Sequence, residues 1–303
     1  KMFNSKKNQE LLDMKLERKM KLNKPYDVKA LKLGKALFPF FLRLVKIKRI
    51  ISGGKINIIN NNYYNKNEKP VIFAITHVGK YDIERAYEAL NEHSILLFGT
   101  PEDVHGTFDG FMLEKLLVNY LDTNDKEDRK VVKRQMIKDL KNGANIMWFP
   151  EGTWNISPNL LVLPMRYGII EVALEANVPI VPVALEYDLD NKIYYINIGK
   201  NFYANKYSNK IDAITVLRDT LATLKWEIFE NLSLINRKDI DSNYWDNYTN
   251  ILANEWHNVD FKHEEKYIFN NELLYSTEIA FNHLQNITPS LQTAFLFNKN
   301  TTI

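Results

Sequence analysis

Two side chains that stand five positions apart, His77 and Asp82, form the most informative pair for chemistry. They follow the apolar run Val71 to Thr76, which predicts a buried strand, and they precede a predicted helix over 82–91. A histidine beside a carboxylate suits base catalysis, because the carboxylate fixes the imidazole tautomer and stabilises the imidazolium that forms on proton uptake. Taken alone, the pair also fits a capping aspartate beside a surface histidine.

A second polar cluster, Glu151, Gly152 and Thr153, directly follows the apolar run 145–149. A carboxylate, a glycine and a hydroxyl at a strand end let the backbone approach a ligand closely and supply polar groups to hold it. The alternative is a Pro-Glu-Gly turn that leads into a loop.

A third segment, Val178-Pro-Ile-Val-Pro182, is rich in β-branched residues and contains two prolines. Each proline removes one donor from a strand ladder. We therefore predict an edge strand or a distorted strand at this position.

These three segments, in this order and with these separations, resemble three motifs of the glycerolipid acyltransferase family, which includes the 1-acylglycerol-3-phosphate acyltransferases. His77-Val-Gly-Lys-Tyr-Asp82 corresponds to the first motif, Phe149-Pro-Glu-Gly-Thr153 to the third, and Val178-Pro-Ile-Val-Pro182 to the fourth. The matched region runs from about Lys69 to Tyr187.

The resemblance implies an α/β acyltransferase domain that takes its acyl group from a thioester of coenzyme A or acyl carrier protein. It implies that His77 deprotonates the acceptor hydroxyl, that Asp82 orients His77, and that no metal, bound cofactor or covalent acyl-enzyme is needed. Acceptor binding would fall to the third motif, namely Glu151, Gly152 and Thr153. Support of the donor or acyl chain would fall to the fourth motif, namely Val178, Pro179, Ile180 and Pro182.

The sequence departs from the family where the acceptor phosphate would bind. The second motif usually contains an arginine, whereas this region reads Val118-Asn-Tyr-Leu-Asp-Thr-Asn124, and the third motif usually continues with an arginine where this chain has Trp154. Neither threonine nor tryptophan can donate two parallel hydrogen bonds as arginine does. We therefore expect an acceptor without phosphate that packs on Trp154, unless Arg166, or Arg129 with Lys133, supplies the missing charge.

The apolar spacing predicts an α/β fold with a mixed, mainly parallel sheet flanked by helices. The predicted strands cover 71–76, 94–98, 145–149, 180–186 and 193–198. The predicted helices cover 82–91, 108–118, 127–141, 168–176 and 211–234. We expect three parts: a basic amphipathic N-terminal helical arm (1–54), the acyltransferase domain (55–236), and an aromatic-rich helical C-terminal extension (237–303).

Positive charge is concentrated in the predicted arm, because no acidic residue occurs between Asp27 and Glu68. Wound as a helix, the segment 29–46 places basic residues on one side and apolar, partly aromatic residues on the other. Such a helix binds an anionic lipid surface, and the expected membrane-binding residues are Lys32, Lys35, Phe38, Phe41, Arg43 and Lys46. The alternative is that the apolar side packs on the protein's own core.

The composition narrows the function classes further. Hydrophobic residues make up 45% of the 303 positions and charged residues 25%, which fits a globular protein with a sizeable core. The absence of cysteine excludes thiolate nucleophiles and disulfides, and a net charge of +3 is too small to indicate nucleic-acid binding. No segment approaches the roughly 20 apolar residues that span a bilayer, and the first residues lack a signal-peptide core.

Together these observations predict a peripheral O-acyltransferase at the cytoplasmic membrane face, in phospholipid or glycolipid biosynthesis. Its expected partners are the lipid surface and the acyl donor, and no nucleic acid. Two alternatives stay open. One is acylation of an unphosphorylated or amine acceptor, and the other is a catalytically silent lipid-binding protein of the same fold.

Overall fold

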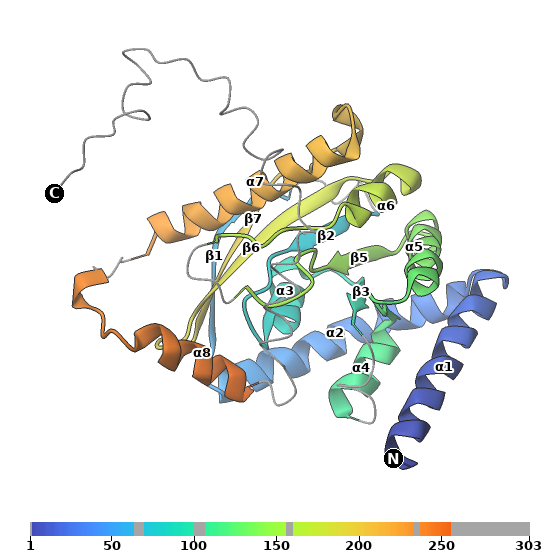
Figure 1. Ribbon diagram of the computed structural model, residues 1–303, viewed down its shortest axis with the longest axis horizontal. Helices are drawn as coiled ribbons and strands as arrows, with labels where there is room; N and C mark the ends of the chain where they lie inside the picture. Colours follow the sequence, from blue (N-terminus) through green and yellow to red (C-terminus); the bar gives the residue numbers. More distant parts are fainter. Residues whose placement is uncertain (1, 64–69, 100–106, 156–159, 233–236, 256–303) are drawn as a thin grey trace. The chain divides into compact units, whose positions relative to one another are not determined.

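The computed structural model describes residues 2–63, 70–99, 107–155, 160–232 and 237–255 (Figure 1). In this part of the chain, a seven-stranded sheet has the strand order β1-β7-β6-β2-β5-β3-β4. The β6–β7 pair is antiparallel, and all other neighbours are parallel. The predicted α/β fold with a mixed, mainly parallel sheet flanked by helices is confirmed.

Most predicted elements are found within a few residues of their expected ends. The strands are β1 (Lys55–Asn61), β2 (Ile72–Ile75), β3 (Ser94–Phe98), β4 (Val118–Tyr120), β5 (Asn145–Trp148), β6 (Ile180–Asp188) and β7 (Ile193–Ile198). The helices are α1 (Met2–Leu22), α2 (Val28–Ile51), α3 (Asp82–Leu90), α4 (Phe108–Leu116), α5 (Lys126–Lys141), α6 (Gly168–Ala176), α7 (Lys210–Glu230) and α8 (Tyr244–Glu255). Helix α1 lies within the predicted helical arm (1–54), although its bounds were not predicted, and strands β1 and β4 are not among the predicted elements.

Helices cover both faces of the sheet (Figure 1). Helices α2, α3 and α4 lie on one face, and α5, α6 and α7 lie on the other. Helix α1 packs on α5, where Arg18 pairs with Asp128 at 2.7 Å, and on the loop before α5, where Lys15 pairs with Asp122 at 2.5 Å. Apolar side chains of the sheet and of α2 to α4 form one continuous core, including Phe73, Ile75, Leu96, Met147 and Val181.

The fourth-motif segment does not form the predicted edge strand, because β6 lies in the interior of the sheet between β7 and β2. Ile180 exchanges hydrogen bonds with Phe202, and the carbonyl of Pro182 accepts from the Gly199 N–H. The nitrogen of Pro182 therefore faces the segment that follows β7, while Val183 bonds to β2. The interior strand tolerates this proline because its missing donor is not on the β2 side.

The apolar side of α2 packs on the protein's own core. Phe38 and Phe41 are buried and lie edge-on to the ring of Tyr87, with centroids 5.5 and 5.6 Å away. The prediction that Phe38 and Phe41 bind a membrane is therefore wrong, because the core takes up the aromatic surface that was assigned to lipid. The basic residues of the predicted set, Lys32, Lys35, Arg43 and Lys46, are exposed.

The division into three parts stays a prediction. Strand β1 begins at Lys55, and α8 covers residues 244–255 of the predicted C-terminal extension, whose remainder lies outside the described residues. Within the described ranges, no helix combines the length and the apolar character that crossing a bilayer requires.

Candidate active site

The structure brings His77 and Asp82 together at the carboxyl end of β2. His77 follows the strand and Asp82 opens α3, with Nδ1 of His77 2.6 Å from Oδ2 of Asp82. Asp82 is fully buried, whereas 17% of the His77 side chain is exposed. Because an ionised carboxylate only accepts, Nδ1 carries the proton and Nε2 keeps a free lone pair. Nε2 finds no hydrogen-bond partner in the described ranges, so it is available as a base.

Asp82 is held by the loop that carries His77. Its Oδ2 also accepts hydrogen bonds from the backbone N–H groups of Val78, at 2.5 Å, and Gly79, at 2.9 Å. Three donors on one oxygen stabilise the ionised carboxylate and fix its position. Asp82 therefore orders the loop, as a capping aspartate would, and also orients the imidazole, as a catalytic pair requires.

The third motif lies beside the first because β2 and β5 are parallel neighbours, with Ala74 opposite Trp148. Their carboxyl ends meet at one edge of the sheet, which is where α/β folds place ligands. Asn155 donates its backbone N–H to the carbonyl of His77 at 2.6 Å. The third-motif loop therefore holds the backbone of the base directly.

Glu151 holds the same backbone from the other side. Its Oε1 accepts from the His77 N–H at 2.9 Å, and its Oε2 accepts from the Leu163 N–H at 2.7 Å. Burial raises the pKa of Glu151, while the charge of Lys225 and the two N–H donors act against this rise. Both carboxylate oxygens are thus occupied by the backbone, so we infer that Glu151 positions His77 instead of making the predicted acceptor contact.

The remaining third-motif residues differ in their access to a ligand. Gly152 is exposed and has φ +77°, a left-handed conformation that favours glycine. Thr153 and Trp154 are buried. The His77 ring lies 4.5 Å from the Phe149 ring and 6.0 Å from the Trp154 ring, measured between centroids.

Trp154 is only 6% exposed, which leaves little of its surface for the predicted acceptor contact. Its ring stands nearly edge-on to the imidazole, at 71°. Trp154 and Phe149 together form apolar walls around the base and restrict the orientation of its ring.

Two of the cations considered for the missing phosphate contacts lie near one another. Arg129 donates from Nη1 to the carbonyl of Thr123, at the position where the second motif lacks its arginine. Burial lowers the pKa of Arg166, and the nearby charge of Arg129 lowers it further. Lys133 is engaged elsewhere, because it pairs with Glu171 at 3.2 Å and also with Glu175. Arg129 and Arg166 are therefore the remaining candidates.

The fourth motif is not brought to the dyad. Ile180 is opposite Ile72, at the start of β2, whereas His77 follows the end of that strand. Pro179, Ile180 and Pro182 are buried, and Val178 is half-buried. Pro182 is opposite Ala74, closer to the end of β2. The predicted support of the donor or acyl-chain site stays a prediction.

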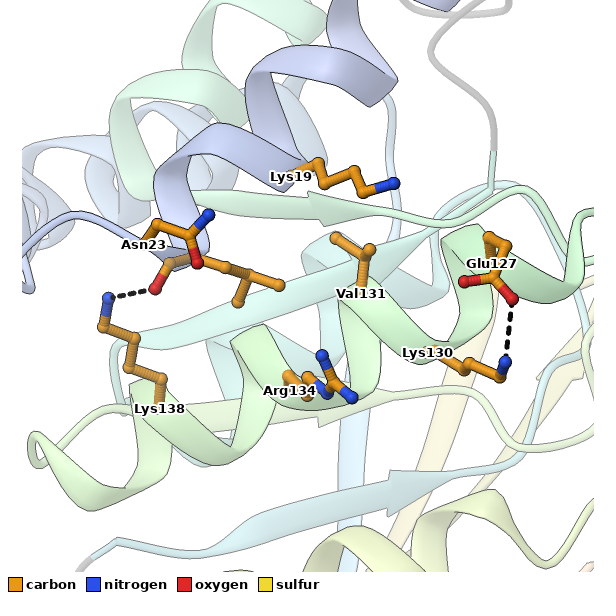
Figure 2. A pocket seen from close by; sticks show the side chains of 8 residues that line it. Lys19, Asn23, Glu127, Lys130, Val131, Arg134 and Lys138 are labelled. Atoms are coloured by element: carbon orange, nitrogen blue, oxygen red, sulfur yellow. Dashed lines mark hydrogen bonds and ion pairs between the residues drawn. The ribbon is translucent and has the colours of Figure 1, made fainter.

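A cavity of about 510 Å³ lies between α1 and α5 (Figure 2). Its lining includes Lys19, Lys130, Arg134 and Lys138 but no residue of the three motifs. Lys130 pairs with Glu127, and Lys138 donates to the Leu22 carbonyl (Figure 2). This cavity is basic and does not contain the dyad. Among the described residues, no cluster of three or more histidine or acidic side chains could hold a metal ion.

Residues that the sequence reasoning missed complete the site. Asn155 lies two positions after Thr153, so proximity to the motif is its signal. Lys225 is a lysine on the apolar side of α7, where it pairs with Glu186 at 3.1 Å, and a charge on a buried helix face is a usable signal. Tyr194 neighbours Asp82 but lies on strand β7. It gives no signal in the sequence, because aromatic residues are common in strands.

Comparisons with known proteins agree with this geometry. Residues 55–186 match the model of the Acyltransferase family. The crystal structure of the 1-acyl-sn-glycerophosphate (LPA) acyltransferase PlsC from Thermotoga maritima is similar, with a TM-score of 0.55 and 15% identity, over 72% of this chain and 89% of that chain. At this identity the likeness concerns the fold alone. No curated protein sequence gives a significant match.

The fold and the site thus define an α/β domain whose residues 55–186 match the Acyltransferase family model. All three motifs lie inside this range, so the family match supports their resemblance to the glycerolipid acyltransferase family, and the likeness to PlsC shows a shared fold.

Proposed function

We propose that the protein transfers a fatty acyl group from a thioester of coenzyme A or acyl carrier protein to a hydroxyl of a lipid acceptor, at the cytoplasmic face of a membrane. The observation that carries this proposal is the His77–Asp82 dyad, with its 2.6 Å contact and an accessible Nε2, inside an acyltransferase domain. Transfer of a labelled acyl group to lipid by the purified protein, compared with His77→Ala, tests this proposal.

The dyad supports direct transfer in one sequence of bond changes. His77 Nε2 takes the proton of the acceptor hydroxyl while the oxygen attacks the thioester carbonyl carbon. The tetrahedral adduct collapses, the carbon–sulfur bond breaks, and the leaving thiolate takes the proton back from the imidazolium. Asp82 stabilises the imidazolium throughout, and neither a metal nor an acyl-enzyme takes part. A catalytically silent lipid-binding protein would not require a buried carboxylate that is bound to the imidazole and fixed by two backbone N–H groups.

The acceptor class can be tested at Arg166. We expected an acceptor without phosphate because two arginines of the family motifs are absent. In the structure, Arg129 and Arg166 lie near one another beside the second-motif loop, so they weaken this expectation. We expect Arg166→Gln to raise KM for lysophosphatidic acid about tenfold or more, since charge-assisted bonds are lost, and to leave KM for monoacylglycerol unchanged.

Arg134→Gln serves as the matched control, because Arg134 lies on the same helix as Arg129 but lines the cavity in Figure 2. Initial rates with one donor and both acceptors would decide the question. A clear preference for monoacylglycerol, with no effect of Arg166→Gln, would contradict the phosphate contact and support the expectation from the motifs.

The outer face of α2 is the part of the arm that suits a lipid surface. Leu33, Phe40, Ile47, Ile50 and Ile51 are exposed there, with Phe40 at 58%. Exposed cations accompany them, namely Lys29, Lys32, Arg43 and Lys46. Apolar side chains beside lysine and arginine are typical of interfacial helices. We therefore propose that this outer face of α2 binds the lipid surface, in place of the buried Phe38 and Phe41.

We expect Phe40→Asp to weaken binding to anionic vesicles at least tenfold, because burying a phenylalanine contributes about 1.5–3 kcal/mol. Flotation with phosphatidylglycerol vesicles measures the effect. Trp226→Asp is the control, since Trp226 is equally exposed on α7. If the Phe40 and Trp226 variants float like the wild type, α2 is not the membrane contact.

A further inference from the structure

Two buried polar atoms lie close to Gly79, next to the dyad. The hydroxyl of Tyr194 and Oδ1 of Asp82 are both buried, and neither has a hydrogen-bond partner of full geometry among the described residues. Both lie beside Gly79: a Cβ placed there would be 3.2 Å from the Tyr194 hydroxyl and 4.0 Å from Oδ1. Because an unpaired buried polar atom is costly, two such atoms at one place indicate a shared contact.

The protonation of Tyr194 suits a donor. Burial raises its pKa well above the usual value, and the neighbouring Asp82 carboxylate raises it further, while the Tyr81 N–H acts in the opposite direction. The phenol therefore keeps its proton at physiological pH, and its natural acceptor is a carboxylate. The Asp82 carboxylate lies near enough to act as a side-chain hydrogen-bond partner of this phenol.

The surroundings of Tyr194 fix the direction of its hydroxyl. Its ring is 2% exposed and stacks on Tyr187, with centroids 4.4 Å apart. Gly79 leaves room for the hydroxyl, since a Cβ at 3.2 Å would crowd it. Gly79 also donates its N–H to Oδ2 of Asp82, so the glycine and the tyrosine act on the same carboxylate.

We infer that Tyr194 is a positioning residue for acyl transfer, whose hydroxyl donates to Oδ1 of Asp82 and thereby fixes the carboxylate that orients His77. This inference rests on the proposed function. With Oδ2 held by His77, Val78 and Gly79, the contact with Tyr194 completes the set of donors around Asp82. Among the described residues, Glu151 and Tyr248 act electrostatically on the dyad itself, and Tyr187 acts on Tyr194. Lys225 and Glu186 lie one step further away, because Lys225 acts on Glu151 and pairs with Glu186.

The test is Tyr194→Phe, which removes only the hydroxyl. We expect kcat to fall about tenfold, the effect of losing one hydrogen bond to a charged group. Asp82 then concentrates more negative charge on Oδ2 and holds the imidazolium more firmly. The base therefore stays protonated to higher pH, and the acidic limb of the pH–rate profile moves upward by roughly half a unit.

Tyr87→Phe is the matched control, because Tyr87 is equally buried and its hydroxyl donates to the Ser94 carbonyl at 2.8 Å, a contact within the fold. It is expected to lower the melting temperature without moving the acidic limb. An unchanged profile in Tyr194→Phe, or a loss of rate by the same factor at every pH, would overturn the positioning role.

A second measurement separates this inference from the proposed function. NMR titration of the His77 imidazole reads the Tyr194 contact without any turnover, and Tyr194→Phe should move its midpoint upward. If the wild type shows no acyl transfer, the proposed function fails while the titration still tests the contact. Gly79→Ala alone should shift the midpoint of the His77 titration, because the added methyl group crowds the Tyr194 hydroxyl. Combined with Tyr194→Phe, which lacks this hydroxyl, it should add little further shift.

Discussion

His77→Ala is expected to lower the rate of acyl transfer by about 10² to 10⁴-fold, the usual contribution of general-base catalysis. The reason is that Nε2 is the accessible nitrogen of the dyad, while Nδ1 is bound to Asp82. The fold should survive, since part of the His77 side chain is exposed and its backbone is held by Glu151 and Asn155 regardless of the side chain. Equal melting temperatures for variant and wild type would establish this.

Asp82 needs a gentler substitution than alanine. Its Oδ2 accepts two backbone N–H groups in a buried loop, so Asp82→Ala would leave buried donors without partners and lower stability as well. Asp82→Asn keeps the shape and one acceptor oxygen but removes the charge that stabilises the imidazolium. We expect a loss of rate in the same range as for His77→Ala. Wild-type rates in either stable variant would exclude the dyad from catalysis.

Glu151→Ala is expected to lower both the stability and the rate. The variant leaves the N–H groups of His77 and Leu163 without their acceptor, and each unsatisfied buried donor costs about 1–3 kcal/mol. Since one of these donors belongs to His77, the base loses its fixed position and kcat should fall at least tenfold. Urea unfolding and initial rates on the same preparations measure both effects.

The changes in kcat, KM and stability of the Glu151 variants distinguish a positioning role from the acceptor contact that the motif predicts. A positioning residue lowers kcat and stability together, whereas an acceptor ligand raises KM and leaves stability unchanged. Glu151→Gln, which keeps one acceptor oxygen, should fall between wild type and alanine. Glu175→Gln, at an exposed carboxylate on α6, is the control and should change neither quantity.

The sequence predicted the central strands and their helices well, because β2, β5 and β6 are short, mostly apolar segments and α5 and α7 have a regular apolar face. It predicted α1 only as part of the helical arm (1–54) and not its bounds, because α1 has few apolar positions and is held on α5 by ion pairs such as Arg18 with Asp128. The position of β6 was misjudged because proline counts against an interior strand, unless the direction of its nitrogen is known.

For the site, the motifs identified the dyad, but they could not show which partner each polar group takes. Glu151 was read as a ligand contact although its oxygens face the backbone of His77 and Leu163. Phe38 and Phe41 were assigned to lipid because a helical pattern shows an apolar side but not what covers it. Tyr194 reaches Asp82 only through the pairing of distant strands, a contact that no local pattern encodes.

Transfer of a radiolabelled acyl chain to lipid by the purified protein shows directly whether the dyad catalyses acyl transfer. Palmitoyl-CoA and palmitoyl-acyl carrier protein are supplied in separate reactions, each with lysophosphatidic acid, monoacylglycerol and a membrane lipid extract as acceptors. The account predicts that the wild type incorporates label into at least one acceptor and that folded His77→Ala loses this activity by at least about 10²-fold. Incorporation at the wild-type rate by His77→Ala, or none by the wild type with any combination, would contradict it.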